Sequence, residues 1–428
     1  MIAGAGVAGI AAARELSSAG LRVTLIEARD RVGGRILTIR DPLSPIPVEL
    51  GAEFIHGAPP DLLAAVEAAE LRTVEVSGSS WYSESGELSR SESGDENEVL
   101  DSLLNYTGED RSFADFLQGT GWDEETKSSA AAFVEGFNAA DQARIGVLSL
   151  ARQQKAENAI HGEKAFRIVD GYDSIVNGLF RALRPEASSL RLNTIAERIE
   201  WTPGHVTLFA SSRVGWELKP FRARRAIVTI PLGVLQAPPE SPGSVEFAPS
   251  LPKIQEAANR LAMGNAVRVA LRFRNRAWEV RPELEGMSFL FSSDPWFPTW
   301  WSESPMRAPM LTAWAGGPKA DRLQGRGKAF LVDRAVKTLA GLLRVDADRL
   351  RESLEAWYTH DWQADQFSRG AYSYVPAGAL DAMETLTKPV DHTLYFAGEA
   401  TDFSGHWGTV HGALASGLRA ARQLLRSL

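Results

Sequence analysis

The sequence contains no cysteine among its 428 residues. Disulfides, thiolate metal sites, iron–sulfur clusters and any cofactor tethered through a cysteine sulfur are therefore excluded. Disulfide-free chains are typical of reducing compartments, although they are not restricted to them. We therefore expect a cytoplasmic protein whose stability comes from an ordinary hydrophobic core.

Long apolar runs and an excess of basic residues are also missing. No window approaches the roughly 18 uninterrupted apolar residues of a membrane span, so we expect no membrane association. Lys and Arg total 46 against 54 Asp and Glu, which gives a net charge of −8. This balance argues against a nucleic-acid partner and mildly favours cationic ligands.

The sequence lacks the familiar metal-binding motifs. It has seven histidines, but no His-Glu-x-x-His pattern or similar cluster. Neither His406 nor His411 has a partner carboxylate at metal-ligand spacing along the chain. We therefore predict that the protein has no metal site.

The first informative feature that is present is a glycine-rich turn between a strand and a helix. Gly4, Gly6 and Gly9 are followed by a strand over 23–26 that ends at Glu27. Glycines permit a tight turn and a close approach of the backbone to a pyrophosphate, and the start of the helix offers unpaired N–H groups. Glu27 can accept hydrogen bonds from ribose hydroxyls. The unit therefore predicts a dinucleotide site.

The length of the chain and the order of its patterns indicate two domains. Helices are predicted over 60–70, 99–104, 113–117 and 126–137, with an exposed loop or hairpin over 77–98. Strands that rejoin the first sheet are predicted over 190–192, 206–209, 226–230 and 395–399. The dinucleotide-binding domain is expected to be discontinuous, with segments 1–57, 164–247 and 388–428. The second domain is expected to comprise residues 58–163 and 248–387.

Five sequence blocks resemble the flavin-dependent amine oxidase family, which includes monoamine, polyamine and spermine oxidases and lysine-specific histone demethylases. The blocks lie in the family's order at residues 4–35, 49–57, 229–235, 369–374 and 396–413. The forms at 55–57 and 409–413 are more similar to polyamine and spermine oxidases than to monoamine oxidases. The resemblance implies an α/β fold with a Rossmann-like FAD-binding domain of the amine oxidase/glutathione reductase type. It also implies a discontinuous substrate-binding domain made of a mixed sheet plus helices.

The resemblance further implies an extended FAD, with its pyrophosphate at the glycine turn and its ribose at Glu27. Ala371 stands where monoamine oxidases carry the flavin-linking cysteine, so the FAD is expected to be non-covalent. The N-terminus of a helix that begins near Thr409 is expected to face flavin N1 and the C2 carbonyl. The residues that the resemblance places at the FAD are Gly4, Gly6, Gly9, Glu27, Ala28, Arg29, Gly34, Arg35, Gly51, Ala52, Glu53, Phe54, Pro231, Trp362, Gly398, Glu399, Thr409 and Val410.

Aromatic residues are expected to orient the substrate. The resemblance places Tyr372 in a cage beside the flavin and packs Trp362 against the ring system; two ordinary core aromatics are the alternative interpretation. Thr409 stands where many relatives have a second cage tyrosine, so a closed cage would need another aromatic. The candidates are Trp296, Trp300, Trp301, Trp314 and Trp407.

Three polar residues are candidates for the substrate site. Arg268 stands where the family usually has a lysine that holds a water at flavin N5; an arginine stays protonated, so it can orient water or an anion but cannot act as a base. The alternation over 267–273 equally fits a solvated strand face that carries Arg268 and Arg272. His56 either bonds the amine or is a structural histidine. Glu53 is a hypothetical partner for the distal ammonium of a polyamine.

The predicted function is oxidation of a primary or secondary amine, with polyamines favoured, to an imine by hydride transfer to flavin N5. Molecular oxygen is expected to reoxidise the flavin and give H2O2. Three alternatives stay open: an L-amino-acid oxidase in which an arginine grips the carboxylate, an NAD-linked dehydrogenase, and a catalytically impaired FAD-binding protein. The residues to which the resemblance assigns catalytic roles are Arg268, Tyr372, His56, Trp362 and Thr409.

Overall fold

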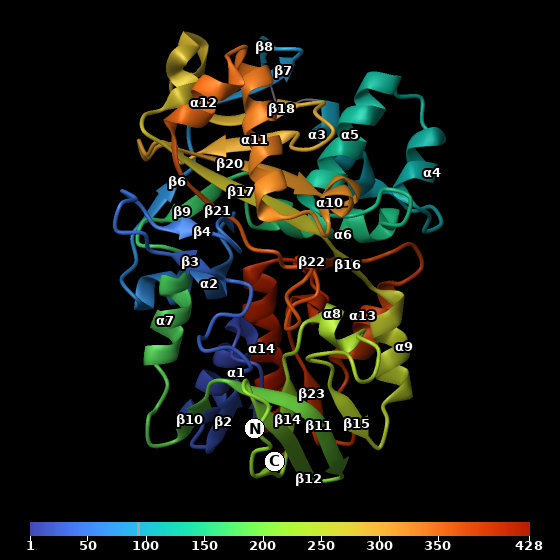
Figure 1. The fold of residues 1–428 in the computed structure, drawn as a ribbon. Helices are drawn as coiled ribbons and strands as arrows, with labels where there is room; N and C mark the ends of the chain where they lie inside the picture. Colours follow the sequence, from blue (N-terminus) through green and yellow to red (C-terminus); the bar gives the residue numbers. More distant parts are fainter. Residues whose placement is uncertain (92–94) are drawn as a thin grey trace.

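One half of the fold is built on a parallel sheet. The computed structural model describes residues 1–91 and 95–428. The five parallel strands lie in the order β10 (Ser188–Arg191), β2 (Val23–Ile26), β1 (Ile2–Ala3), β14 (Ala226–Val228) and β23 (Leu394–Phe396). Strands β2, β1, β14 and β23 are short, mostly apolar and largely buried, as strands of a parallel sheet require, whereas the edge strand β10 is only partly buried. This half is at the bottom of Figure 1.

Two helices pack together and place their N-termini at one edge of this sheet. Helices α1 (Val7–Ser18) and α14 (Val410–Leu425) pack side by side, and a Cβ added at Gly417 would lie 2.2 Å from the Ala8 carbonyl oxygen. Glycine at this position therefore permits the close approach. Each helix follows a parallel strand, so both N-termini lie at the carboxyl edge of the sheet, where open α/β sheets bind their ligands.

One predicted strand joins a different sheet. A separate four-stranded sheet has the order β13 (Phe221–Ala223), β12 (His205–Ser212), β11 (Thr194–Thr202) and β15 (Glu246–Ala248). The prediction that 206–209 rejoins the first sheet is therefore wrong, because β12 pairs antiparallel with β11 instead. Alternation of apolar residues predicts which face of a strand is buried, but it does not predict the strand with which it pairs.

The other half of the fold contains a mixed sheet. Its seven strands have the order β21 (Leu354–Tyr358), β17 (Ala266–Phe273), β20 (Met310–Gly316), β19 (Thr299–Ser302), β18 (Met287–Ser292), β7 (Ser79–Glu84) and β8 (Glu87–Arg90). Helix α11 (Lys328–Leu343) packs over this sheet (Figure 1), and its buried face shares one apolar core with the strands. The interpretation of a solvated face on β17 is wrong, since Arg268 and Arg272 are both buried.

The four helices predicted for the first insertion are present, and one further helix over 147–159 was not predicted. The structure has α2 (Pro60–Ala68), α3 (Asp95–Ser102), α4 (Phe113–Gln118), α5 (Glu124–Phe137) and α6 (Val147–Ala159). The region predicted as a loop or hairpin over 77–98 contains the β7–β8 hairpin and the start of α3, and residues 92–94 lie outside the described residues. In the described part of the chain, no helix combines the length and apolar character needed to cross a bilayer.

Two small sheets lie where the two halves meet. The antiparallel ribbon of β16 (Ala262–Gly264) and β22 (Tyr372–Tyr374) runs between the parallel sheet and the mixed sheet (Figure 1). The second sheet pairs β9 (Ala165–Ile168) with β5 (Ile55–His56) and β6 (Thr73–Glu75). The predicted combination of a Rossmann-like domain with a mixed sheet plus helices is confirmed, and β22 and β5 carry two of the predicted site residues, Tyr372 and His56.

Candidate active site

The glycine turn has the geometry of a phosphate cradle. Gly4 has a φ of +106°, and a Cβ added at Gly9 would lie 2.1 Å from the Gly4 carbonyl oxygen. Gly6 is the N-cap of α1 and supplies no side-chain cap, so the first N–H groups of the helix are left for another acceptor. Next to a Cβ at Gly6 there is only the Cα of Gly34, at 4.0 Å. The turn therefore fits the pyrophosphate of a dinucleotide.

Glu27 is held in place by the backbone on both of its carboxylate oxygens. The amide of Ala5 donates to Oε2 at 2.8 Å and the amide of Arg29 donates to Oε1 at 2.9 Å. Each carboxylate oxygen can accept a second hydrogen bond, which suits two ribose hydroxyls. The Arg29 guanidinium donates to Asp365 and Ser368, and its Nη1 also lies 3.9 Å from Glu27 Oε1. Ala28 lies between the two anchored residues.

An ion pair connects the cradle to the predicted cage aromatic. The Arg35 guanidinium donates to Glu399 Oε1 at 2.8 Å and to the Ala371 carbonyl oxygen at 2.9 Å. The backbone amide and the hydroxyl of Ser373 both donate to Glu399 Oε2. Tyr372 is therefore fixed through its neighbours on both sides to the Arg35–Glu399 pair, although the three segments are far apart in the sequence.

The loop at residues 50–53 packs against the same pair. A Cβ at Gly51 would lie 1.9 Å from the Arg35 carbonyl oxygen, which accepts from the amide of Ala52 at 3.3 Å. The buried Trp362 indole donates to the Leu50 carbonyl oxygen at 2.7 Å. Trp362 is thus held beside the loop that contains Gly51 and Ala52.

Three other predicted cofactor residues lie at the ends of elements. Pro231 is the N-cap of α8 (Leu232–Leu235), directly after β14 and Thr229. Gly398 has a φ of +130°, and its amide donates to the Ser416 hydroxyl on α14 at 2.9 Å. Val410 is the first residue of α14. All three follow the carboxyl ends of parallel strands, where the dinucleotide is expected.

Thr409 caps α14. Its hydroxyl accepts from the Gly412 amide at 3.0 Å and donates to the His406 carbonyl oxygen at 2.6 Å. A threonine N-cap of this kind stabilises a helix by about 1 kcal/mol. The side chain therefore orients the helix N-terminus and does not supply an aromatic wall.

Aromatic rings that could take the place of the second cage tyrosine lie in one continuous series, which we call the aromatic row. Successive ring centroids are 5.8, 5.7, 6.0 and 5.4 Å apart along the row Trp314, Trp301, Phe54, His56 and Phe137. The Tyr372 hydroxyl donates to the Phe137 carbonyl oxygen at 2.7 Å, so the row ends beside Tyr372.

The other candidate tryptophans lie in hydrophobic cores. Trp296 and Trp300 pack with the mixed sheet, and Trp407 packs in the core beside the parallel sheet. Of the five tryptophans that the sequence offered as a second cage residue, only Trp301 and Trp314 therefore belong to the aromatic row.

His56 is an apolar-packed histidine inside this row. Its ring meets Phe54 at 6.0 Å and Phe137 at 5.4 Å. Burial lowers the pKa of His56, and the nearby Glu157 carboxylate only partly opposes that shift. The imidazole is therefore neutral at neutral pH and can accept a hydrogen bond from an amine N–H.

Arg268 is neutralised by Glu53. Its guanidinium forms an ion pair with Glu53 and donates to the Gly51 carbonyl oxygen at 3.0 Å, and it lies 5.3 Å from the Trp301 ring centre. Glu53 also accepts from Arg167 Nε at 2.8 Å. Burial would raise the pKa of Glu53, but Arg268 and Arg167 hold it below its ordinary value. The hypothesis that Glu53 pairs with a substrate ammonium is therefore wrong, because two arginines already occupy it.

The same buried cluster contains two further carboxyl groups. Glu303 lies 3.4 Å from Arg167 Nε, and burial raises its pKa to about 7. Burial also raises the pKa of Glu49, to about 8. A cavity of about 20 Å³ lies between these groups, with Arg167 and Glu53 in its wall. At neutral pH this cluster therefore holds at least one proton.

We expect the substitution Glu303→Gln to flatten the pH dependence of stability. The folded protein binds the Glu303 proton more tightly than the unfolded chain does, so this contribution is complete below about pH 4.5, the ordinary pKa of Glu, and is lost as the pH rises through about 7. The amide imitates the protonated acid at every pH. Relative to the wild type, the variant should therefore gain roughly 1–3 kcal/mol between pH 5 and pH 8. Urea unfolding at both pH values measures the free energy of unfolding. If the change between pH 5 and pH 8 were the same in the variant as in the wild type, the pKa of Glu303 would not be raised by folding.

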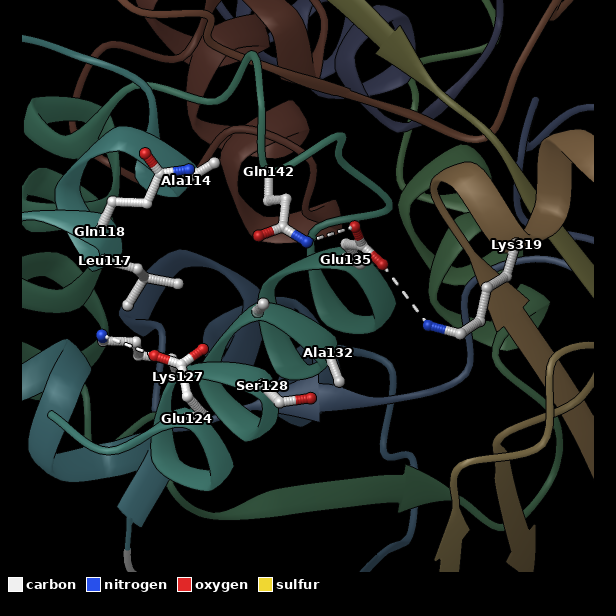
Figure 2. A pocket seen from close by; sticks show the side chains of 11 residues that line it. Ala114, Leu117, Gln118, Glu124, Lys127, Ser128, Ala132, Glu135, Gln142 and Lys319 are labelled. Atoms are coloured by element: carbon white, nitrogen blue, oxygen red, sulfur yellow. Dashed lines mark hydrogen bonds and ion pairs between the residues drawn. The ribbon is translucent and has the colours of Figure 1, made fainter.

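A larger hollow lies elsewhere. It measures about 380 Å³ and is lined by α4, α5 and two residues from other segments, Gln142 and Lys319. Figure 2 shows both of these side chains bonded to Glu135. None of the predicted site residues lines this hollow, so we do not assign it to the substrate.

The sequence motifs missed several residues that the structure brings to the site. Arg167 pairs with both Glu53 and Glu303, and Phe137 completes the aromatic row. Glu157 lies near His56. None of the four belongs to a glycine or family motif, and a buried charge in a strand, such as Arg167 in β9, was the one available signal that a partner had to exist.

Comparison with known proteins gives the family. The model of the flavin containing amine oxidoreductases matches residues 7–118 and 79–425. A lysine-specific histone demethylase 1 homologue of Arabidopsis thaliana is 29% identical over the whole chain, but the match covers 52% of that relative. The chain thus spans about half the length of that relative. Polyamine oxidase 2 of Arabidopsis thaliana is 27% identical, over 98% of this chain and 86% of the relative.

The solved structures support the fold. A putrescine oxidase bound to putrescine superposes with a TM-score of 0.80, at 21% identity, over 99% of this chain and 98% of that chain. Cyclohexylamine oxidase from Brevibacterium oxydans gives a TM-score of 0.81 at 20% identity, with the same coverage. Taken with the family model, which covers most of its length, this chain belongs to the flavin containing amine oxidoreductase family.

Proposed function

We propose that the protein binds FAD non-covalently and oxidises a primary or secondary amine to an imine, with molecular oxygen as the final acceptor and H2O2 as product. The observation that carries this proposal is the connection of Tyr372 to the cradle. Arg35 and Glu399 hold Ala371 and Ser373, the two neighbours of Tyr372, so the dinucleotide site and the substrate site are one bonded unit.

The residues of the cradle fit an FAD. The glycine turn offers uncapped N–H groups, and Glu27 offers an acceptor on each oxygen. Ala371 at the position of the family's flavin-linking cysteine, in a chain without cysteine, supports a non-covalent cofactor. When bound, the flavin would accept a hydride from the carbon next to the amine nitrogen.

The chain's own residues would bind and orient the amine. The aromatic row and Tyr372 supply an apolar surface that favours the uncharged amine over its ammonium form. The neutral imidazole of His56 can accept a hydrogen bond from the amine N–H. The positive end of α14, oriented by Thr409, favours negative charge at the place where the resemblance puts flavin N1.

Polyamines are the favoured substrate class. Polyamine oxidases of plants are among the relatives, and the structural neighbours include putrescine oxidase. The net charge of −8 attracts cations over long range. The histone demethylase homologues share the sequence over about half their own length, so a methylated lysine is the second amine to be tested.

The L-amino-acid oxidase alternative is not favoured. It requires a free arginine for the substrate carboxylate, whereas Arg268 is neutralised by Glu53 and lies against Trp301. The family match also counts against an NAD-linked dehydrogenase. A catalytically impaired flavoprotein differs from an active oxidase only in turnover, so an activity measurement distinguishes the two.

A peroxide assay with a panel of amines tests the proposal. We expect H2O2 from spermine, spermidine or putrescine, and little from leucine or phenylalanine. Anaerobic addition of the best amine should bleach the flavin absorbance. Protein without a yellow chromophore, or a flavin that no amine bleaches, would contradict the proposal. Greater turnover of leucine than of spermine would instead favour the amino-acid oxidase.

We expect the substitution Tyr372→Ala to lower amine turnover while the flavin stays bound. The phenol ends the aromatic row and is held by the Phe137 carbonyl, so its removal leaves the amine less well oriented. A loss of kcat/KM on the order of 100-fold corresponds to the misplacement of a substrate by about 1 Å. Steady-state kinetics and flavin absorbance per chain measure the two effects. Loss of the flavin itself would show that Tyr372 supports the cofactor instead.

A further inference from the structure

Two histidines and a carboxylate from different elements meet beside the aromatic row. Glu157 comes from α6, His406 precedes α14, and His411 lies in the first turn of α14. One ligand atom of each lies within 4.8 Å of the others. His406 Nδ1 is 3.6 Å from Glu157 Oε1, and the two imidazole centroids are 4.6 Å apart at 72°. We call this group the His–Glu cluster.

One buried ring nitrogen of each histidine has no hydrogen-bond partner among the residues that the structure describes. Neither His406 Nδ1 nor His411 Nε2 has a hydrogen-bond partner among residues 1–91 and 95–428, and His411 is only 6% exposed. A buried polar nitrogen without a partner costs about 1–3 kcal/mol. Two such nitrogens next to one carboxylate point to a ligand that accepts electron pairs.

We propose that Glu157, His406 and His411 form a binding site for a divalent transition-metal ion of the Zn²⁺ type. Two imidazoles and one carboxylate are a known zinc ligand set that leaves one position for water. Tetrahedral coordination places the donor atoms about 3.3 Å apart, so the most distant pair must approach by up to about 1.5 Å. The prediction of no metal from the sequence failed to include Glu157, because 249 positions of the sequence separate it from His406.

The electrostatics of the cluster suit a cation. The two imidazoles and the carboxylate together offer three electron-pair donors and a single negative charge. The other titratable group that faces Glu157 is His56, whose pKa is lowered by burial.

The helix dipole works against the site, but weakly. The N-terminus of α14 disfavours a nearby cation by about 0.3–1 kcal/mol. Structural zinc binding in proteins contributes about 10 kcal/mol or more, so the free energy of coordination outweighs the repulsion by the helix dipole. A bound ion would join α6 to the first turn of α14 and add positive charge close to His56.

Isothermal titration calorimetry with ZnCl2 on tag-free, chelator-treated holoprotein tests the proposal. We expect one equivalent to bind, and we expect Glu157→Gln and His406→Asn each to weaken binding at least tenfold. His161→Ala is the matched control, because His161 lies 3.7 Å from Glu163 in an exposed pair without a second histidine. This variant should bind like the wild type.

A spectroscopic measurement gives a second, independent test of the proposed metal site. Cu²⁺ added to the same protein should give an electron paramagnetic resonance spectrum with two coupled imidazole nitrogens, reduced to one in His406→Asn. Flavin absorbance and circular dichroism confirm that each variant is folded. Absence of Zn²⁺ binding in the folded wild type, or equal loss in His161→Ala and His406→Asn, would overturn the site. Neither outcome bears on amine turnover, so the proposed function is tested separately.

Discussion

Replacing Glu53 by Ala is expected to destabilise the protein by about 3–5 kcal/mol, because it leaves buried guanidinium groups without their shared counter-charge. Glu53 is only 6% exposed, and it pairs with both Arg167 and Arg268 while Trp301 Nε1 donates to it at 3.2 Å. Arg167 keeps Glu303 at 3.4 Å and backbone acceptors at Ser302 and Ser304, whereas Arg268 keeps, among the described residues, the Gly51 carbonyl and the Trp301 ring. Urea unfolding followed by tryptophan fluorescence measures the loss.

Two further variants separate charge from shape. Glu53→Gln keeps the volume and an acceptor oxygen but removes the charge, so we expect it to lose nearly as much stability as the Ala variant. Glu384→Ala removes an exposed i,i+4 partner of Lys388, which is worth at most about 0.5 kcal/mol. If Glu53→Ala were no less stable than Glu384→Ala, the buried charge pairing would have no energetic importance.

The substitution Gly9→Ala is expected to lower flavin affinity by tenfold or more, which is about 1.4 kcal/mol or more. The added Cβ would lie 2.1 Å from the Gly4 carbonyl oxygen and 3.1 Å from the Thr229 hydroxyl oxygen. The backbone of the turn must therefore move, and the N–H groups of α1 lose their alignment with the pyrophosphate. Flavin absorbance per chain after gel filtration, and titration of FAD into flavin-free protein, measure the effect.

Gly6→Ala is the informative comparison. Its Cβ meets only the Cα of Gly34 at 4.0 Å, and the φ of Gly6, −72°, suits any residue. In flavin-free protein this variant should unfold like the wild type, yet it should bind FAD poorly, since the second glycine lets the backbone approach the pyrophosphate. Gly341→Ala, which meets no atom within 4 Å, should change neither property. Normal FAD binding by Gly6→Ala would contradict the placement of the pyrophosphate.

Local features of the fold could be predicted from the sequence. The strand, glycine turn, helix and acidic residue over 2–27 form as expected, because tight turns and helix starts depend on residues that are neighbours in the chain. The helices α2, α3, α4 and α5 of the insertion followed from the sequence pattern, whereas α6 was not predicted. The family blocks gave the fold class, since they span both halves of the molecule.

Contacts between distant segments could not be predicted in the same way. The alternation over 267–273 placed Arg268 opposite the apolar side chains, but the pattern did not say that Glu53 covers that face. The strand over 206–209 was recognised, yet its sheet was assigned wrongly. Glu157 was not connected with His406 at all.

The sequence by itself determined the nucleotide cradle, the order of the elements and membership of an oxidoreductase family. Only the tertiary structure decided which charges are neutralised, which aromatics form the row, and which histidines share a carboxylate. The physical reason is the range of the interactions. Backbone conformation and periodicity depend on neighbours in the chain, whereas a buried charge or nitrogen depends on whichever distant group folding brings to it.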